Sequence, residues 1–184
     1  MNTSINIGLN IFSVVLLLSG FVMLFISGLI YLKLNKDVRT FAYVMLAVAV
    51  WVIGEGLIMG SSTLPEMLFW TRVEYTGISF LPAFWIIAII RLVNKEKWLT
   101  SAGLILIFLI PFLTWVIVLT DEIHHLYYSR YWVDRSGPFP LMAVAGGPWY
   151  KVHTLNFYCM LTLGLYLLIS PLNMPTKFSG SRDM

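Results

Sequence analysis

Long apolar segments alternate with short polar ones along the whole chain. A membrane-spanning helix needs about 20 mostly apolar residues, and the pattern predicts five such spans, at 7–32, 41–60, 67–93, 98–120 and 150–169. Pro82 and Pro111 are expected to bend the third and fourth spans. The sequence therefore predicts an all-α, polytopic transmembrane helix bundle over residues 1–170, followed by a short tail at 171–184.

Composition narrows the class of protein further. Of the 184 residues, 59% are apolar and only 11% are charged, against about 25% charged residues in soluble domains. This composition excludes a disordered chain, and the basic residues are too scattered to form a nucleic-acid-binding face. The lone Cys159 excludes a disulfide framework. The expected partner is therefore the lipid bilayer.

Lysine and arginine residues predict the orientation. Eight of them flank the predicted spans on one side and three on the other, while Arg72 lies inside a span. Because basic residues accumulate in cytoplasmic loops, we expect a multi-pass protein of the cell membrane with the N-terminus outside and the C-terminus in the cytoplasm.

One loop on the outer side is long enough to fold. The segment 121–148 is rich in aromatic residues, which argues against disorder, and its residue pattern predicts a β-hairpin with strands near 128–134 and 139–144 and a turn at 135–137. Loops of this length are usually functional or disordered. Two interpretations stay open, namely a structural cap on the helix ends and a lid over a ligand.

Ionisable residues inside the spans mark a candidate site, because charges in a membrane are costly and usually functional. Glu55, Arg72 and Glu74 fall in the outer thirds of their spans, and Lys151 and His153 begin the fifth span. We expect Glu55 to pair with Arg72, and Glu74 and Lys151 to reach the headgroups. The alternatives are an outward-facing polar ligand pocket and a proton or ion path. The candidate ligand-binding residues are Glu55, Arg72, Glu74, Tyr75, His124, His125, Lys151 and His153.

Catalytic and metal functions are not expected. Known protease, hydrolase and nucleotide-binding motifs are missing from the sequence, so no catalytic residue and no cofactor is predicted. Asp121, Glu122, His124, His125 and His153 are the residues that could form a metal site. Adjacent histidines on a helix point apart, so both rarely bind one ion, and no metal is predicted.

Several short motifs occur in a characteristic order between residues 10 and 170. They are 41-FAYVMLAVAVW-51, 69-FW-70, 74-EYTGISFLP-82, 98-WLT-100, 124-HHL-126, 136-SGPFP-140 and 147-GPW-149 followed by His153. In this order they resemble the N-terminal seven-transmembrane sensor region of bacterial histidine kinases. The resemblance implies a receptor module that feeds an output domain.

The chain departs from that family pattern, since five spans are predicted and no kinase domain is found. We therefore expect a truncated, non-catalytic sensor that binds an unknown extracytoplasmic ligand under the 121–148 loop and does not autophosphorylate. Its expected partners are a second copy or a full-length sensor. The alternatives are a structural or accessory membrane protein without a ligand, and a transporter subunit.

Overall fold

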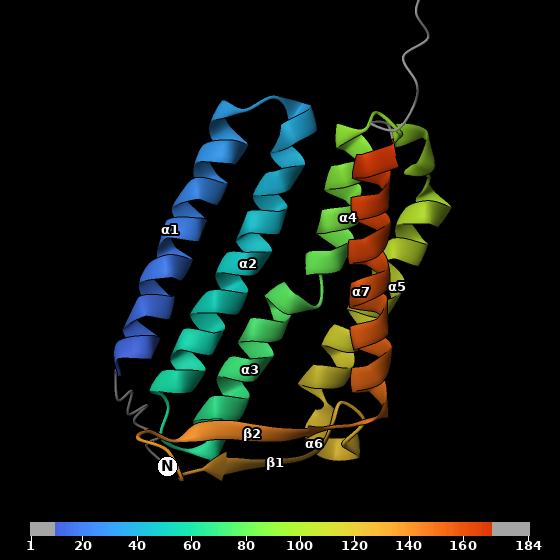
Figure 1. Ribbon diagram of the computed structural model, residues 1–184. Coiled ribbons are helices and arrows are strands. Elements are labelled where there is room, and N and C mark those ends of the chain that lie inside the picture. Colours follow the sequence, from blue (N-terminus) through green and yellow to red (C-terminus); the bar gives the residue numbers. More distant parts are fainter. Residues whose placement is uncertain (1–9, 171–184) are drawn as a thin grey trace, which may run out of the picture.

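A computed structural model describes residues 10–170 of the chain as a helical bundle with one β-hairpin. The elements are α1 (Ile11–Lys33), α2 (Lys36–Gly60), α3 (Leu64–Ile78), α4 (Leu81–Leu92), the short 3-10 turn η1 (Glu96–Trp98), α5 (Ser101–Leu119), α6 (Asp121–His124), β1 (Tyr128–Asp134), β2 (Leu141–Gly146) and α7 (Pro148–Ile169). Figure 1 shows the long helices side by side and the hairpin across one end. The predicted fold class is confirmed.

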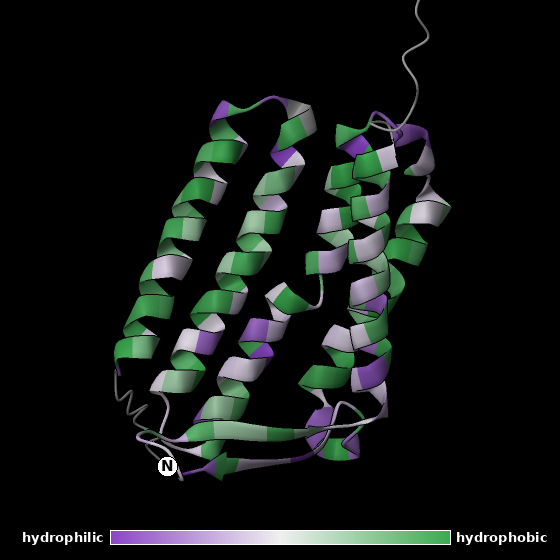
Figure 2. Cartoon of the chain, viewed as in Figure 1, coloured by the Kyte–Doolittle hydropathy of each residue, from purple (hydrophilic) through white to green (hydrophobic). Residues whose placement is uncertain are grey.

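Five helical segments of the described chain are long and apolar enough to cross a membrane. The predicted number of five spans is therefore confirmed, and the helices begin and end within a few residues of the expected positions. The helix of the fourth span, α5, begins at Ser101 rather than at residue 98, because residues Glu96–Trp98 form η1. Residues 7–9 of the first predicted span and the tail at 171–184 lie outside the described residues. Figure 2 shows hydrophobic colour along most of the length of the long helices, as expected of helices that lie in lipid.

The third span is broken into two helices, α3 and α4. Pro82 lies in the first turn of α4 and has no N–H with which to bond the carbonyl group of Ile78. The chain instead tightens before the break, where the Phe80 N–H donates to the Gly77 carbonyl at 3.2 Å. The expectation that Pro82 bends this span is confirmed. Pro111 lies inside α5, and the helix continues across it.

The helices pack in sequence order: α1 lies against α2, α2 against both α3 and α4, and α4 against α7. Helix α4 is the most enclosed element, and its buried isoleucines form the main apolar core together with Leu167 of α7. Serine hydroxyl groups join α1 to α2, since Ser13 donates to the Gly56 carbonyl and Ser27 to the Ala42 carbonyl, both at 2.7 Å. Such bonds are favourable where no water competes for the donor.

Glycines bring α2 and α3 unusually close together. A Cβ on Gly54 of α2 would lie 2.6 Å from the Cβ of Glu74, and a Cβ on Gly77 of α3 would meet the Ala47 carbonyl oxygen. Small residues allow helix backbones to approach in this way. The close approach places the part of α3 that lies nearer the hairpin directly beside Glu55 of α2, which fixes the geometry of the candidate site.

The predicted hairpin is confirmed, with its first strand at the predicted residues, but its second strand runs over Leu141–Gly146 rather than 139–144. Strands β1 and β2 pair antiparallel, with Tyr131 opposite Val144 and Val133 opposite Met142. The hairpin extends from the start of α7 back across α3 to α1 (Figure 1), where the rings of Phe139 and Phe12 lie 5.6 Å apart. It therefore covers the bundle end at which α1 and α7 begin and α2 and α5 finish.

Candidate ligand-binding site

A cavity of about 190 Å³ lies beneath the hairpin, between β2, α2 and α3. Its lining residues are Glu55, Ile58, Met59, Glu74, Tyr75, Tyr128, Leu141, Met142 and Val144. Figure 2 shows hydrophilic colour on the parts of α2 and α3 that lie nearest this end of the bundle. The cavity therefore combines two carboxyl groups and two phenol groups with an apolar wall.

The two carboxyl groups of the cavity lie side by side. Glu74 is 5% exposed, and its side chain lies beside both the Glu55 carboxyl group and the Trp51 indole. Glu55 is half-buried next to it. The expectation that Glu74 reaches the headgroups is therefore wrong, because Glu74 is buried against Glu55.

The predicted pairing of Glu55 with Arg72 is wrong. The Arg72 guanidinium contacts the Glu122 carboxylate at 2.7 Å, because Arg72 and Glu74, two positions apart on α3, point to different faces of the helix. Because α2 packs closely on α3, Glu55 lies beside Glu74. Arg72 lies on another face of α3 and contacts Glu122 of α6. In the part of the chain that the structure describes, neither Glu55 nor Glu74 forms an ion pair with a lysine or an arginine.

We expect the ion pair between Arg72 and Glu122 to contribute little stability. Their side chains are 33% and 53% exposed, and ion pairs open to solvent are worth about 0–1 kcal/mol. A double-mutant cycle with Arg72→Gln and Glu122→Gln, measured by unfolding in detergent, checks this. A coupling energy well above that range would show that the pair is shielded from solvent and stabilises the contact between α3 and α6.

Tyrosines connect the cavity to the base of the hairpin. The hydroxyl groups of Tyr75 and Tyr128 are hydrogen-bonded at 2.8 Å, and the Tyr75 ring meets the fully buried Tyr127 ring edge-on at 5.0 Å. Burial raises the pKa of the Tyr127 and Tyr128 hydroxyl groups well above the usual value of tyrosine. Both phenols are therefore neutral at physiological pH.

Asp121 anchors the start of the hairpin. Its carboxylate accepts the backbone N–H groups of Tyr127 at 2.7 Å and Tyr128 at 3.2 Å, and the side chain is buried. The N–H of Gly147, just before α7, donates to the Tyr127 carbonyl at 2.7 Å. These bonds hold both ends of the hairpin against the helix ends and keep Tyr128 over the cavity.

The histidines and Lys151 do not line the cavity. His124 bonds within its own turn, through the Thr120 hydroxyl and the Leu126 N–H. His125 lies beside the ring of Tyr131, and Lys151 is exposed. His153 is buried, with its ring 6.3 Å from that of Tyr75, behind the cavity wall. The predicted candidates that meet at the cavity are therefore Glu55, Glu74 and Tyr75.

The metal alternative finds no support in the geometry. Within residues 10–170 no group of three or more His, Cys, Asp or Glu side chains is placed to hold an ion. Asp121 is committed to backbone N–H groups, and His153 lies inside the bundle beside Tyr75 and Tyr127. Of these residues, Asp121 and His124 approach each other, with 3.8 Å between a carboxylate oxygen and a ring nitrogen, but no third candidate ligand joins them in the described part of the chain.

Sequence reasoning missed most of the apolar lining and Tyr128. The strand alternation could have indicated Met142 and Val144, because residues two apart share one face of a strand. Nothing in the sequence showed that this face would lie over Glu55 and Glu74, since that depends on how the hairpin folds back over the bundle.

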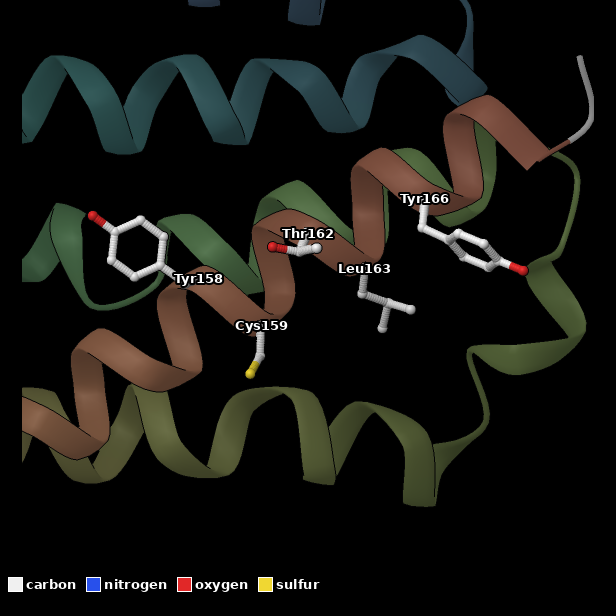
Figure 3. Close-up of a pocket in the computed structure, with 5 residues that line it drawn as sticks. All are labelled: Tyr158, Cys159, Thr162, Leu163 and Tyr166. Carbon is white, nitrogen blue, oxygen red and sulfur yellow. The ribbon is translucent and has the colours of Figure 1, made fainter.

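A second hollow, of about 520 Å³, lies on the outer surface of α7. Figure 3 shows its lining, Tyr158, Cys159, Thr162, Leu163 and Tyr166, along one side of that helix. Tyr158 and Tyr166 are more than 60% exposed, and the residues lie within a predicted span. The hollow therefore faces the lipid, and none of its residues is a sequence-predicted candidate.

Comparison with known proteins supports the sensor interpretation. The family model described as the N-terminal 7TM region of histidine kinase matches residues 15–178. The match covers all the helices that carry the cavity and the whole hairpin. No curated protein and no solved structure shows significant similarity to the chain.

Proposed function

Because the chain belongs to the family of the N-terminal 7TM region of histidine kinase, we propose that it is a ligand-sensing input module with its ligand site beneath the hairpin. The family is a non-catalytic membrane sensor region that acts in signal transduction. The observation that carries the proposal is the cavity itself, because it places buried ionisable groups under a folded extramembrane cover. Ionisable residues at membrane depth are by default functional.

The arrangement of the walls supports a sensing role. The ligand would touch α2, α3 and the hairpin at once, through Glu55, Glu74 and Met142. Helix α3 is separated from α4 by the break before Pro82, so a change at the cavity acts on a helix that is not continuous with the core helix α4. A bound ligand would favour one arrangement of α3 and the hairpin against α2 over another. A ligand that binds two arrangements with different affinity shifts the equilibrium between them, as a switch requires.

The site would face the outside of the cell. The hairpin covers the end of the bundle at which α1 begins, whereas Lys33, Arg39, Arg91, Lys95 and Lys97 lie at the opposite end or near it (Figure 1). Accumulation of basic residues on the cytoplasmic side supports an orientation with the N-terminus and the hairpin outside.

Cysteine labelling of intact cells tests this orientation. In a Cys159→Ala background, Ser136→Cys in the exposed hairpin turn should react with a membrane-impermeant maleimide, whereas Lys97→Cys at the opposite end should react only after lysis. Both positions are exposed, so access and not burial decides the result. Labelling of position 97 from outside would overturn the orientation.

A ligand screen that compares the wild type with a cavity-filling variant tests the site. A panel of small molecules is added to the purified chain, and its unfolding midpoint is compared with that of Met142→Trp, which fills the cavity. The matched control is Ala143→Trp, one position along β2, whose side chain points to the other face of the strand. We expect compounds that stabilise the wild type and Ala143→Trp but not Met142→Trp. A panel without such compounds contradicts the proposed function.

A further inference from the structure

We propose that the cavity beneath the hairpin binds a small organic cation, a primary amine in its ammonium form, between Glu55, Glu74 and the rings of Tyr75 and Tyr128. The inference rests on the proposed function and names the chemical class of its ligand. Three independent features of the cavity carry it: the absence of a counter-charge on the carboxyl pair, the aromatic wall, and the size of the space.

The carboxyl pair lacks a positive partner within residues 10–170. The guanidinium of Arg72 is taken by Glu122, and no ion pair joins Glu55 or Glu74 to a lysine, arginine or histidine. Without a positive partner, ionising both of two adjacent carboxyl groups is unfavourable in free energy, because the two negative charges repel each other. An ammonium group supplies both the missing positive charge and three N–H donors.

The aromatic wall suits the same ligand. Tyr75 and Tyr128 line the cavity beside the carboxyl groups, and aromatic faces attract ammonium ions, most strongly where water is excluded. The mutual hydrogen bond of their hydroxyl groups, at 2.8 Å, fixes both rings in place. Neither phenol carries a positive charge that would oppose a cation.

The remaining walls and the volume define the rest of the ligand. Ile58, Met59, Leu141, Met142 and Val144 offer an apolar surface opposite the carboxyl groups, which suits a short hydrocarbon chain. At about 190 Å³ the cavity is below the 300–1,000 Å³ typical of pockets for drug-sized ligands. A carboxylate or phosphate ligand would be repelled by the glutamates. A calcium ion takes six to eight oxygen ligands, more than the two carboxyl groups supply.

Thermal unfolding of the full chain in detergent, in phosphate buffer at constant pH and ionic strength, tests the inference with three probes of equal chain length. They are n-butylamine, n-butanol and butyrate. We expect a saturable rise of the midpoint with butylamine, of roughly 5–10 °C at a hundredfold excess over its Kd, and no rise with the neutral or the anionic probe.

Variants assign the effect to the carboxyl pair. Glu55→Gln with Glu74→Gln should abolish the butylamine shift, and Glu55→Gln alone should weaken binding at least about tenfold, because a charge-assisted bond is lost. Glu122→Gln removes an exposed carboxylate at the same end of the bundle, outside the cavity, and should leave the shift unchanged. Should the double variant fail to fold, the single variant decides.

The outcomes separate this inference from the proposed function. Equal shifts with butylamine and butanol, no shift with butylamine, or a shift that survives in Glu55→Gln would each overturn the cationic ligand. If the screen against Met142→Trp still finds cavity-dependent ligands, the sensing site stands and only its ligand class is wrong. If that screen also finds none, the proposed function falls as well.

Discussion

Replacing Gly54 with alanine should destabilise the protein by about 1–3 kcal/mol, the usual cost of forcing extra atoms into a packed interior. The new Cβ would lie 2.6 Å from the Cβ of Glu74 and 2.8 Å from its Cα. Backbone and Cβ atoms cannot move aside by a change of rotamer, so α2 and α3 must separate. The separation would also pull Glu55 away from Glu74 and reshape the cavity.

The matched control is Gly28→Ala on α1. A Cβ at that position meets no described atom within 4 Å, and alanine favours a helix over glycine by up to about 1 kcal/mol. The control should therefore be neutral or slightly stabilising. Unfolding in detergent, followed by circular dichroism, compares the two variants. Equal midpoints for Gly54→Ala and the wild type would contradict the close approach of α2 and α3.

The elements of the fold were predictable because each depends on local sequence. Apolar segments of sufficient length become helices in a membrane, where backbone groups must be satisfied internally. The hairpin followed from strand-forming residues on either side of the turn predicted at 135–137, and the structure places β1 at the predicted residues 128–134. The break in the third span followed from Pro82.

The partners of the buried charges were not predictable, because they depend on how the helices are rotated and how closely they approach. Sequence gives the depth of Glu55, Arg72 and Glu74 in their spans, and at similar depth opposite charges are the natural pair. The structure instead joins the two acids, because Gly54 and Gly77 bring α2 and α3 together along one face. Arg72 faces elsewhere and meets Glu122.

The cavity itself was only half predictable. The sequence indicated a polar pocket on the outer side, and it left open whether the long loop is a cap or a lid. What it could not give is the course of the hairpin from α7 back to α1, which brings Met142 within 3.7 Å of the Thr71 hydroxyl. That course depends on tertiary bonds, above all those of Asp121.

Replacing Asp121 with alanine should release the hairpin and destabilise the protein by about 3–6 kcal/mol. The carboxylate accepts the N–H groups of Tyr127 and Tyr128, and bonds to a charged acceptor are each worth about 1.5–3 kcal/mol. Both tyrosines are buried, so their N–H groups would lose this acceptor without access to water. With Tyr128 displaced, the cavity would lose its outer wall, while the spanning helices would still insert into the membrane.

Asp134→Ala is the matched control at the other end of β1. Its carboxylate is exposed and accepts the N–H of Ser136, two residues away, so its loss should change stability by less than about 1 kcal/mol. Hydrogen exchange of the Tyr127 and Tyr128 amides, together with the unfolding midpoint, measures the difference. Unchanged amide protection in Asp121→Ala would show that the buried tyrosine rings, and not the carboxylate, hold the hairpin on the bundle.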